Sequence, residues 1–210
     1  MGPVSASRLN DSKQLSLSLL YWLQNDAPRH DDQPGAYPNL YMRPDLSGTT
    51  DGFAKYPYIR EARRIQAEYV VKEQDVAAYT NEGKDRAPSF ADSVGVGAYR
   101  IDLHPSTNGA NTIDTSTLPF EIPLRSLVPT RMKNLIPACK NLGVTHITNG
   151  CYRLHPVEWN IGESAAALAS YTLRMGSSQA VSASADSVKE LRALLVSQGV
   201  ELRWPQLRAL

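Results

Sequence analysis

The sequence has few cysteines, no long apolar run and almost no net charge. Two cysteines in 210 residues do not make a disulfide framework, so a reducing compartment or plain burial explains them. No apolar run approaches the roughly 20 residues that are needed to span a bilayer. The net charge of +1 gives no electrostatic reason to expect nucleic acid as a partner. We therefore expect a cytoplasmic protein that binds neither a membrane nor nucleic acid.

Two kinds of catalytic motif and the dinucleotide fingerprint are also missing. The chain contains no Gly-x-Ser-x-Gly and no His-Glu-x-x-His. The stretch Gly95-Val-Gly97-Ala-Tyr-Arg100 begins like a dinucleotide fingerprint, but it lacks the third glycine and lies within a strand pattern. Neither a nucleophile elbow nor a pyrophosphate-binding turn is therefore indicated.

The residues that are present describe an ordinary globular chain, 42% hydrophobic and 20% charged. Apolar residues recur on one helical face over residues 11–25, and Asp11 with Gln14 forms a plausible capping pair. The apolar run 15–23 could instead be the core of a signal peptide. Its serines and flanking acidic residues favour an amphipathic helix.

A segment without helical or strand periodicity follows, over residues 28–57. It is dense in Pro, Gly, Asp and Tyr, and a structureless segment of this length is unusual inside a compact domain. Such a segment lines a site, lies over a neighbouring domain or is disordered. Its tyrosine and phenylalanine side chains argue against disorder.

Three stretches carry strand patterns. Apolar and polar residues alternate over 65–71, and a second alternating stretch covers 94–103. The third strand is expected over 120–128, where Pro123 limits the pairing to an edge or a bulge. A β-rich region therefore precedes the C-terminal part of the chain.

The C-terminal part reads as a short apolar run followed by two helices. The run is at 134–138, and the helices are expected over 156–174 and 185–198, because their apolar residues share one face. Residues 177–184, which are rich in Ser and Ala, read as a linker between the two helices.

One strand face presents Arg100, Asp102 and His104 together. These side chains could form a proton-transfer or carboxylate-binding surface. A solvated strand face with an incidental ion pair is an equally good interpretation. Because His104 precedes Pro105, we expect it at the end of the strand.

The densest cluster of polar candidates lies at 139–163. A short strand, a polar loop and a helix that starts at proline can aim backbone N–H groups at an anionic or electron-rich ligand, although an ordinary connection has the same pattern. A zinc site is the third interpretation, with the ligands Cys139, His146, Cys151 and His155. Their spacing matches no zinc-finger pattern, so we expect no metal.

Four ordered motifs resemble the FAD-dependent oxidoreductase family. Residues 143–163 are similar to its C-terminal flavin-contacting segment, and residues 57–65, 94–105 and 120–129 are similar to its upstream motifs. The resemblance extends from about Leu15 to Pro205. Six residues of the C-terminal segment fall in step with the family pattern: Thr145, His146, Gly150, Arg153, Pro156 and Gly162.

The resemblance implies an α+β or α/β fold, the C-terminal part of an FAD/NAD(P)-binding-type fold. A mixed β-sheet would form the substrate region, and the last strand and helix of the flavin domain would follow it. The implied regions are a β-rich substrate region with an N-terminal helix at 1–130, a flavin-contacting strand–loop–helix at 131–176, and a linker with a C-terminal helix at 177–210.

The resemblance also implies the cofactor FAD and a small substrate bearing a hydroxyl or an amine, with sugar-derived molecules among the candidates. His104 would transfer the proton and Arg60 would anchor the substrate. The implied cofactor-binding residues are Thr145, His146, Asn149, Gly150, Arg153, Pro156, Val157, Glu158, Trp159 and Gly162.

Two departures from the family pattern shape the expected function. Cys139-Lys140 stands where the family has Gly-Arg, and no Gly-rich turn is present to hold the pyrophosphate of FAD. We therefore expect a fragment or one half of a split enzyme, inactive unless a separate chain supplies the FAD-binding segment. The alternative is a non-catalytic remnant or interaction module that retains the substrate half of the fold.

Overall fold

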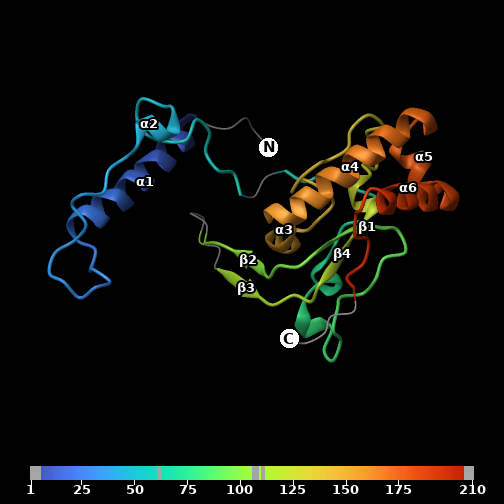
Figure 1. The fold of residues 1–210 in the computed structure, drawn as a ribbon, viewed down its shortest axis with the longest axis horizontal. Helices are drawn as coiled ribbons and strands as arrows, with labels where there is room; N and C mark the ends of the chain where they lie inside the picture. The colour runs from blue at the N-terminus through green and yellow to red at the C-terminus, as the bar shows by residue number, and fades with distance from the viewer. Residues whose placement is uncertain (1–5, 61–62, 106–108, 110–111, 206–210) are drawn as a thin grey trace. The chain divides into compact units, whose positions relative to one another are not determined.

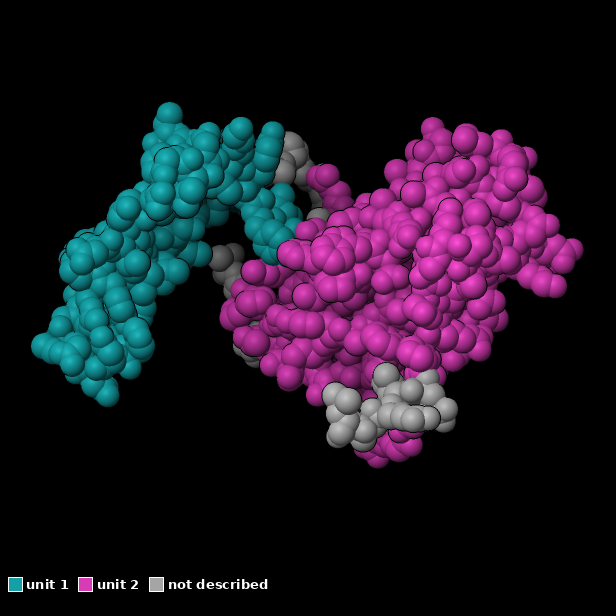
Figure 2. All heavy atoms as spheres, viewed as in Figure 1, with its two compact units in different colours: residues 1–59 teal, residues 60–210 magenta. Residues whose placement is uncertain are grey.

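The computed structural model describes residues 6–60, 63–105, 109 and 112–205. The chain divides into two compact units, residues 1–59 and residues 60–210 (Figures 1 and 2). The division that the sequence suggested, at residues 130 and 176, stays a prediction.

The structure is a mixture of short antiparallel strands and helices, as the α+β prediction had it. The first unit contains α1 (Ala6–Asn25) and α2 (Pro44–Ser47). The elements of the second unit are, in chain order, η1 (Glu73–Asp75), η2 (Ala78–Thr80), β1 (Ser93–Gly97), β2 (Ile101–Leu103), β3 (Ile113–Thr115), β4 (Phe120–Pro123), η3 (Leu124–Leu127), α3 (His146–Tyr152), α4 (His155–Met175), α5 (Ser178–Ala183) and α6 (Ala185–Ser197).

The first unit is built on α1, which ends at the predicted residue but begins five residues earlier, at Ala6. No residue of α1 is buried. An ion pair between Lys13 and Asp51, 2.5 Å long, joins the helix to the following segment. Within the described chain, no helix is both long and apolar enough to cross a membrane.

Two small sheets replace the predicted mixed sheet. β1 pairs with β4, and β2 pairs with β3; both pairs are antiparallel, and the described residues form no larger sheet. The predicted strand 94–103 is therefore two strands, because the chain leaves one ladder after Gly97 and enters another at Ile101. Pro123 lies opposite Ser93, next to a register shift in β1, as the predicted bulge requires. The strand predicted over 120–128 is correct only at Phe120–Pro123, because residues 124–127 form η3 instead.

The predicted strand over 65–71 is wrong. Ala67 forms a single antiparallel bridge with Pro129, and Val71 forms a single parallel bridge with Val144. Both side chains are buried, so the alternating pattern reported burial correctly. The two bridges lead to different partners in opposite directions, and no continuous ladder can form.

In the C-terminal part, two predicted elements agree with the structure and three predictions are wrong. α4 and α6 lie within one residue of their predicted bounds. The predicted polar loop before α4 is the helix α3, and the predicted Ser/Ala linker is the helix α5. The run 134–138 forms no strand.

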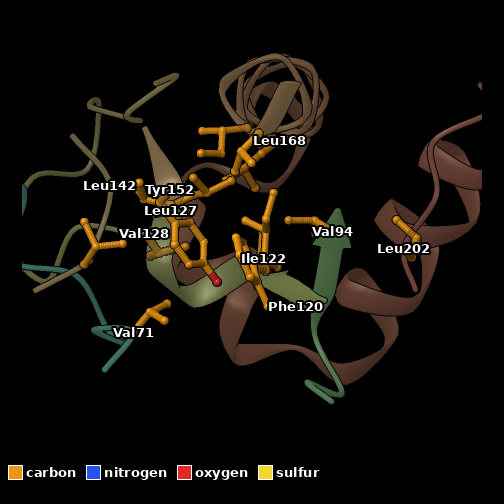
Figure 3. Close-up of a cluster of buried hydrophobic side chains, with 14 of the residues drawn as sticks. Val71, Val94, Phe120, Ile122, Leu127, Val128, Leu142, Tyr152, Leu168 and Leu202 are labelled. Atoms are coloured by element: carbon orange, nitrogen blue, oxygen red, sulfur yellow. The ribbon is translucent and has the colours of Figure 1, made fainter. Parts of the chain in front are cut away.

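The core of the second unit lies between β1–β4 and the C-terminal helices. α4 packs on β1 and on α6, while α3 packs on β2 (Figure 1). The buried Tyr152 ring stacks on Phe120, with ring centroids 4.6 Å apart, and its hydroxyl donates to the Glu121 carbonyl at 2.7 Å. Figure 3 shows Tyr152, Phe120, Leu168 and Leu202 in one apolar cluster that joins α3, α4, β4 and the C-terminal segment.

Candidate functional site

A pocket of about 210 Å³ lies between the end of β1 and the start of α4. Residues 96–99 line one wall, and Trp204 from the C-terminal segment lines another. The start of α4 contributes Leu154, Pro156, Val157 and Asn160. Three parts of the chain that are distant in sequence therefore meet at this pocket.

Glycine at position 97 allows β1 to approach its neighbours. A Cβ atom there would lie 2.4 Å from the Phe120 ring and 3.0 Å from the Val157 side chain. The carbonyls at this end of the sheet belong to the paired residues Gly97 and Phe120, and they accept hydrogen bonds of 3.0 and 3.1 Å from the Trp204 indole N–H. The sheet, the pocket wall and the C-terminal segment are thus fixed together.

The first turn of α4 adjoins the pocket without a side-chain cap. Leu154 occupies the N-cap position and Pro156 lies in the first turn, where its missing N–H costs no helical hydrogen bond. The helix's bonding begins with Glu158 N–H to Leu154 O at 2.8 Å. Because the first N–H groups of a helix have no partner within it, this end carries positive character.

Thr145 stabilises the start of α3. Its hydroxyl accepts from the Thr148 N–H at 3.1 Å, and the Thr148 hydroxyl in turn donates to the Val71 carbonyl at 2.8 Å. This capping box is the local reason that the polar stretch forms a helix. The predicted cofactor-binding residue Thr145 therefore has a structural role in the described chain.

Gly150 and Arg153 join α3 to β2. A Cβ atom on Gly150 would lie 3.0 Å from the Asp102 N and 3.2 Å from the Asp102 O, so glycine permits close packing. The Arg153 side chain is 4% exposed and donates from Nη2 to the Asp102 carbonyl. Both predicted cofactor-binding residues thus hold the strand that carries Asp102.

Asn149 is 1% exposed and only half satisfied. Its Nδ2 donates to the Lys140 carbonyl at 2.8 Å, whereas its Oδ1 has no hydrogen-bond partner among the described residues. A buried amide oxygen without a partner is uncommon and costs free energy. Asn149, which was predicted to bind the cofactor, therefore has a buried amide oxygen that is free to accept a hydrogen bond.

Glu158 faces the loop before α3. Its carboxylate accepts from the Cys139 thiol at 2.9 Å and lies 4.0 Å from the Lys140 Nζ. Burial, and then the hydrogen bond to Glu158, raise the pKa of Cys139. Burial also raises the pKa of Cys151. Neither thiol is thus activated as a nucleophile.

The remaining predicted cofactor-binding residues differ in exposure. His146 is exposed at the start of α3, and Trp159 is 72% exposed on α4. Gly162 is half-buried, and a Cβ atom there would lie 3.3 Å from the Ala138 carbonyl. Of the ten predicted residues, Pro156 and Val157 are the two that line the pocket.

His104 and Arg60 lie outside the pocket lining. The His104 Nε2 lies 3.4 Å from the Asp102 Oδ2, and its side chain is half exposed. Arg100, the third member of the predicted strand face, forms an ion pair with Asp114 on β3. Arg60 is exposed, and its motif neighbours Glu61 and Ala62 lie outside the described residues.

Sequence reasoning missed several lining residues. Tyr99 and Trp204 form the aromatic part of the wall, and Asn160 contributes an amide. The two glycines of β1 were a usable signal, because glycine inside a strand marks close backbone approach. No local pattern pointed to Trp204, which reaches the pocket from beyond the last helix.

The described residues contain no cluster of three or more His, Cys, Asp or Glu side chains that could hold a metal ion. The four proposed zinc ligands are separated by their roles. The Cys139 thiol donates to Glu158, Cys151 is buried inside α3, and His146 and His155 are exposed.

Comparison with protein families assigns the chain to a class. Residues 4–195 match the family described as FAD dependent oxidoreductase. The match covers most of the chain, and the chain therefore belongs to the FAD-dependent oxidoreductase family. No curated protein and no solved structure matches it.

The start of α4 fits one edge of a flavin ring. The uncapped helix end favours negative charge at the ring's pyrimidine edge. The part of the chain that the structure describes has no Gly-rich turn between a strand and a helix that could hold a pyrophosphate. The fit therefore covers the ring and not the ADP half.

Proposed function

We propose that this chain supplies the ring-contacting and substrate-side residues of an FAD-dependent oxidoreductase. Its substrate is a small molecule with a hydroxyl or an amine, sugar-derived molecules among them. The supporting observation is the pocket beside the uncapped start of α4, in a chain that belongs to this family. The uncapped first turn of α4 would face the pyrimidine edge of the ring.

Oxidation of an alcohol removes a hydride from carbon and a proton from oxygen. FAD, when bound, accepts the hydride and supplies the oxidising power of the reaction. The hydroxyl proton passes to the His104 imidazole, and the carbon–oxygen single bond becomes a carbonyl. The Asp102 carboxylate, 3.4 Å from His104 Nε2, stabilises the imidazolium that forms. Arg60 anchors a polar group of the substrate.

The His104→Ala variant tests this assignment in the enzyme reconstituted with its FAD-binding segment and loaded with FAD. Loss of a general base lowers the rate of flavin reduction by about 100-fold or more, measured by stopped-flow absorbance. His30→Ala is the matched control, since His30 is a histidine of the other unit that stacks on Tyr37. An unchanged rate in His104→Ala would remove His104 from the mechanism.

The ADP half of FAD is held by residues outside these 210, on a longer or a separate chain. Two observations support this part of the proposal. In the part of the chain that the structure describes, no Gly-rich turn joins a strand to a helix. Met132 and Leu135 are exposed apolar side chains that another polypeptide could cover.

Flavin retention measures this directly. The 210-residue chain alone is expected to lose FAD on desalting, and a chain with the Gly-x-Gly-x-x-Gly turn should restore retention. Stoichiometric flavin on the chain alone would contradict the proposal. If the added chain restored no binding, the chain would be better explained as a non-catalytic interaction module.

A further inference from the structure

We infer that the pocket between β1 and α4 binds a single apolar ring. The ligand would be a ring-bearing alcohol or amine, with benzyl alcohol as the simplest probe. His104 and Arg60 are not lining residues, so this site is distinct from the one proposed for proton transfer. Binding of the ring needs this chain's own residues and no flavin.

The size of the pocket sets the first limit. Cavities of about 150 Å³ with apolar walls accept benzene. The present pocket, of about 210 Å³, therefore has room for one six-membered ring with a small substituent. A bicyclic or larger ring system would extend beyond it.

The chemistry of the wall sets the second limit. Val96, Leu154 and Val157 supply aliphatic surface, and Tyr99 and Trp204 supply aromatic surface. A sugar would leave most of its hydroxyls without partners here, and each unpaired buried hydroxyl costs free energy. The wall therefore favours an apolar ring over a sugar.

Asn160 gives the ligand an orientation. Its Nδ2 lies 3.5 Å from the Pro156 carbonyl, at the outer limit of a hydrogen bond, so the amide can turn toward a ligand. A Cβ atom on Gly95 would lie 3.2 Å from the Asn160 Oδ1, so the glycine leaves the amide its space. One hydroxyl or amine on the ring would bond to this amide.

Trp204 is a fixed part of the wall. Both hydrogen bonds of its indole N–H go to backbone carbonyls, of Gly97 and Phe120, and its own carbonyl accepts from Arg86 at 2.8 Å. A side chain held in this way loses little further freedom when a ligand binds. Its ring is thus prepared for an aromatic or alicyclic partner.

The experiment titrates the full 210-residue chain, without FAD, with benzyl alcohol and separately with glucose. Ligand-observed NMR reports binding, and millimolar affinity is expected for so small a molecule. Benzyl alcohol should bind, and glucose should not at the same concentrations. Trp204→Ala should weaken benzyl alcohol binding by about 10-fold or more, because a large apolar contact surface is lost. Trp159→Ala is the matched control, since Trp159 is 72% exposed on α4 and is not a lining residue.

A second variant keeps the test valid if Trp204→Ala fails to fold. Ala98 is exposed at the rim of the pocket, so Ala98→Leu should narrow the pocket and weaken binding without disturbing the core. Failure of benzyl alcohol to bind the folded chain, or equal binding of glucose, would overturn the inference. So would equal losses in Trp204→Ala and Trp159→Ala. FAD retention is measured separately, so ring binding and the proposed function can fail independently.

Discussion

The two units of the chain are stabilised in different ways. In the described part of residues 1–59, only Ala27 and Ala36 are buried, and α1 presents exposed Leu and Trp side chains. The unit's ion pairs, including Lys13–Asp51, lie on its surface. The second unit has a continuous apolar core and partly buried ion pairs such as Asp92–Arg125. The first unit therefore has a long helix but no apolar core, and its exposed ion pairs contribute little free energy of folding in place of a core.

The largest expected effect comes from removing core volume in the second unit. Phe120→Ala deletes a ring that stacks on Tyr152 and should lower the free energy of unfolding by about 3–5 kcal/mol. Leu19→Ala removes a side chain that is 56% exposed on α1, so its effect should stay within about 0.5 kcal/mol. Urea denaturation monitored by circular dichroism compares the two variants. Equal losses would mean that α1 is covered in solution.

The next effect comes from the ion pairs of the two units. The Asp92 Oδ2 accepts from the Arg125 backbone N–H at 3.1 Å and from its Nε at 3.0 Å. Asp92→Ala should therefore cost about 2 kcal/mol, because charged hydrogen bonds are lost in a partly buried setting. Lys13→Ala breaks an exposed pair and should cost at most about 1 kcal/mol. Thermal unfolding of the two variants should give the lower midpoint for Asp92→Ala. The opposite order would mean that burial does not determine how much each ion pair stabilises the protein.

A smaller effect is expected from helix capping. Thr145→Ala removes the hydroxyl that caps α3 and should cost about 1 kcal/mol. Thr145→Ser keeps the hydroxyl and should retain most of the stability. In the first unit, α2 has Arg43 at its N-cap without a side-chain cap, so Arg43→Ala should lose no cap. Denaturant midpoints of the three variants, measured under one set of conditions, test this ranking. A loss in Arg43→Ala as large as that in Thr145→Ala would contradict it.

The smallest effect is a pH dependence at Tyr69. Burial, and then the hydrogen bond to Asp75, raise the pKa of Tyr69 to about 12. The folded state therefore holds the phenolic proton more tightly than the unfolded chain, whose tyrosine pKa is about 10. The resulting stability is complete below pH of about 10 and is lost as the pH rises toward 12.

Tyr69→Phe isolates that contribution. The variant should lose less stability than the parent chain between pH 9 and 11, by urea denaturation at about those two values. Tyr56→Phe in the first unit is the control, because Tyr56 is 83% exposed. Identical pH dependence of the parent and Tyr69→Phe would show that Tyr69 titrates alike in the folded and unfolded chains.

The sequence predicted the elements whose signal is local. The bounds of α4 and α6 followed from apolar periodicity, and Pro123 correctly indicated a bulge. The strand predicted over 120–128 was too long, because the chain turns into η3 after Pro123. The sequence failed at residues 65–71, because alternation reports which side chains are buried and not which segment pairs with them. It also failed at α3, where Asn149 and Gly150 are poor helix formers and the capping box of Thr145 decides the outcome.

The candidate site was predicted less well than the fold. Pro156 and Val157 were predicted because proline marks the start of a helix, and a helix start beside a loop is a common place for ligands. Both line the pocket, and their role in binding the cofactor stays a prediction. Arg153 and Gly150 carry polar or small side chains that equally suit packing on β2, which is what they do. The sequence does not distinguish a ligand-binding role from a packing role for such residues, because tertiary contacts decide between the two.

The hydrogen bonds of Trp204 have a consequence for synthesis. The strands β1 and β4 leave the ribosome long before residue 204, yet two carbonyls at the end of their ladder find their partner in the Trp204 indole. A nascent chain therefore carries an unfinished sheet until residue 204 emerges. A chain cut after α6 would keep both strands but would lose the residue that closes them.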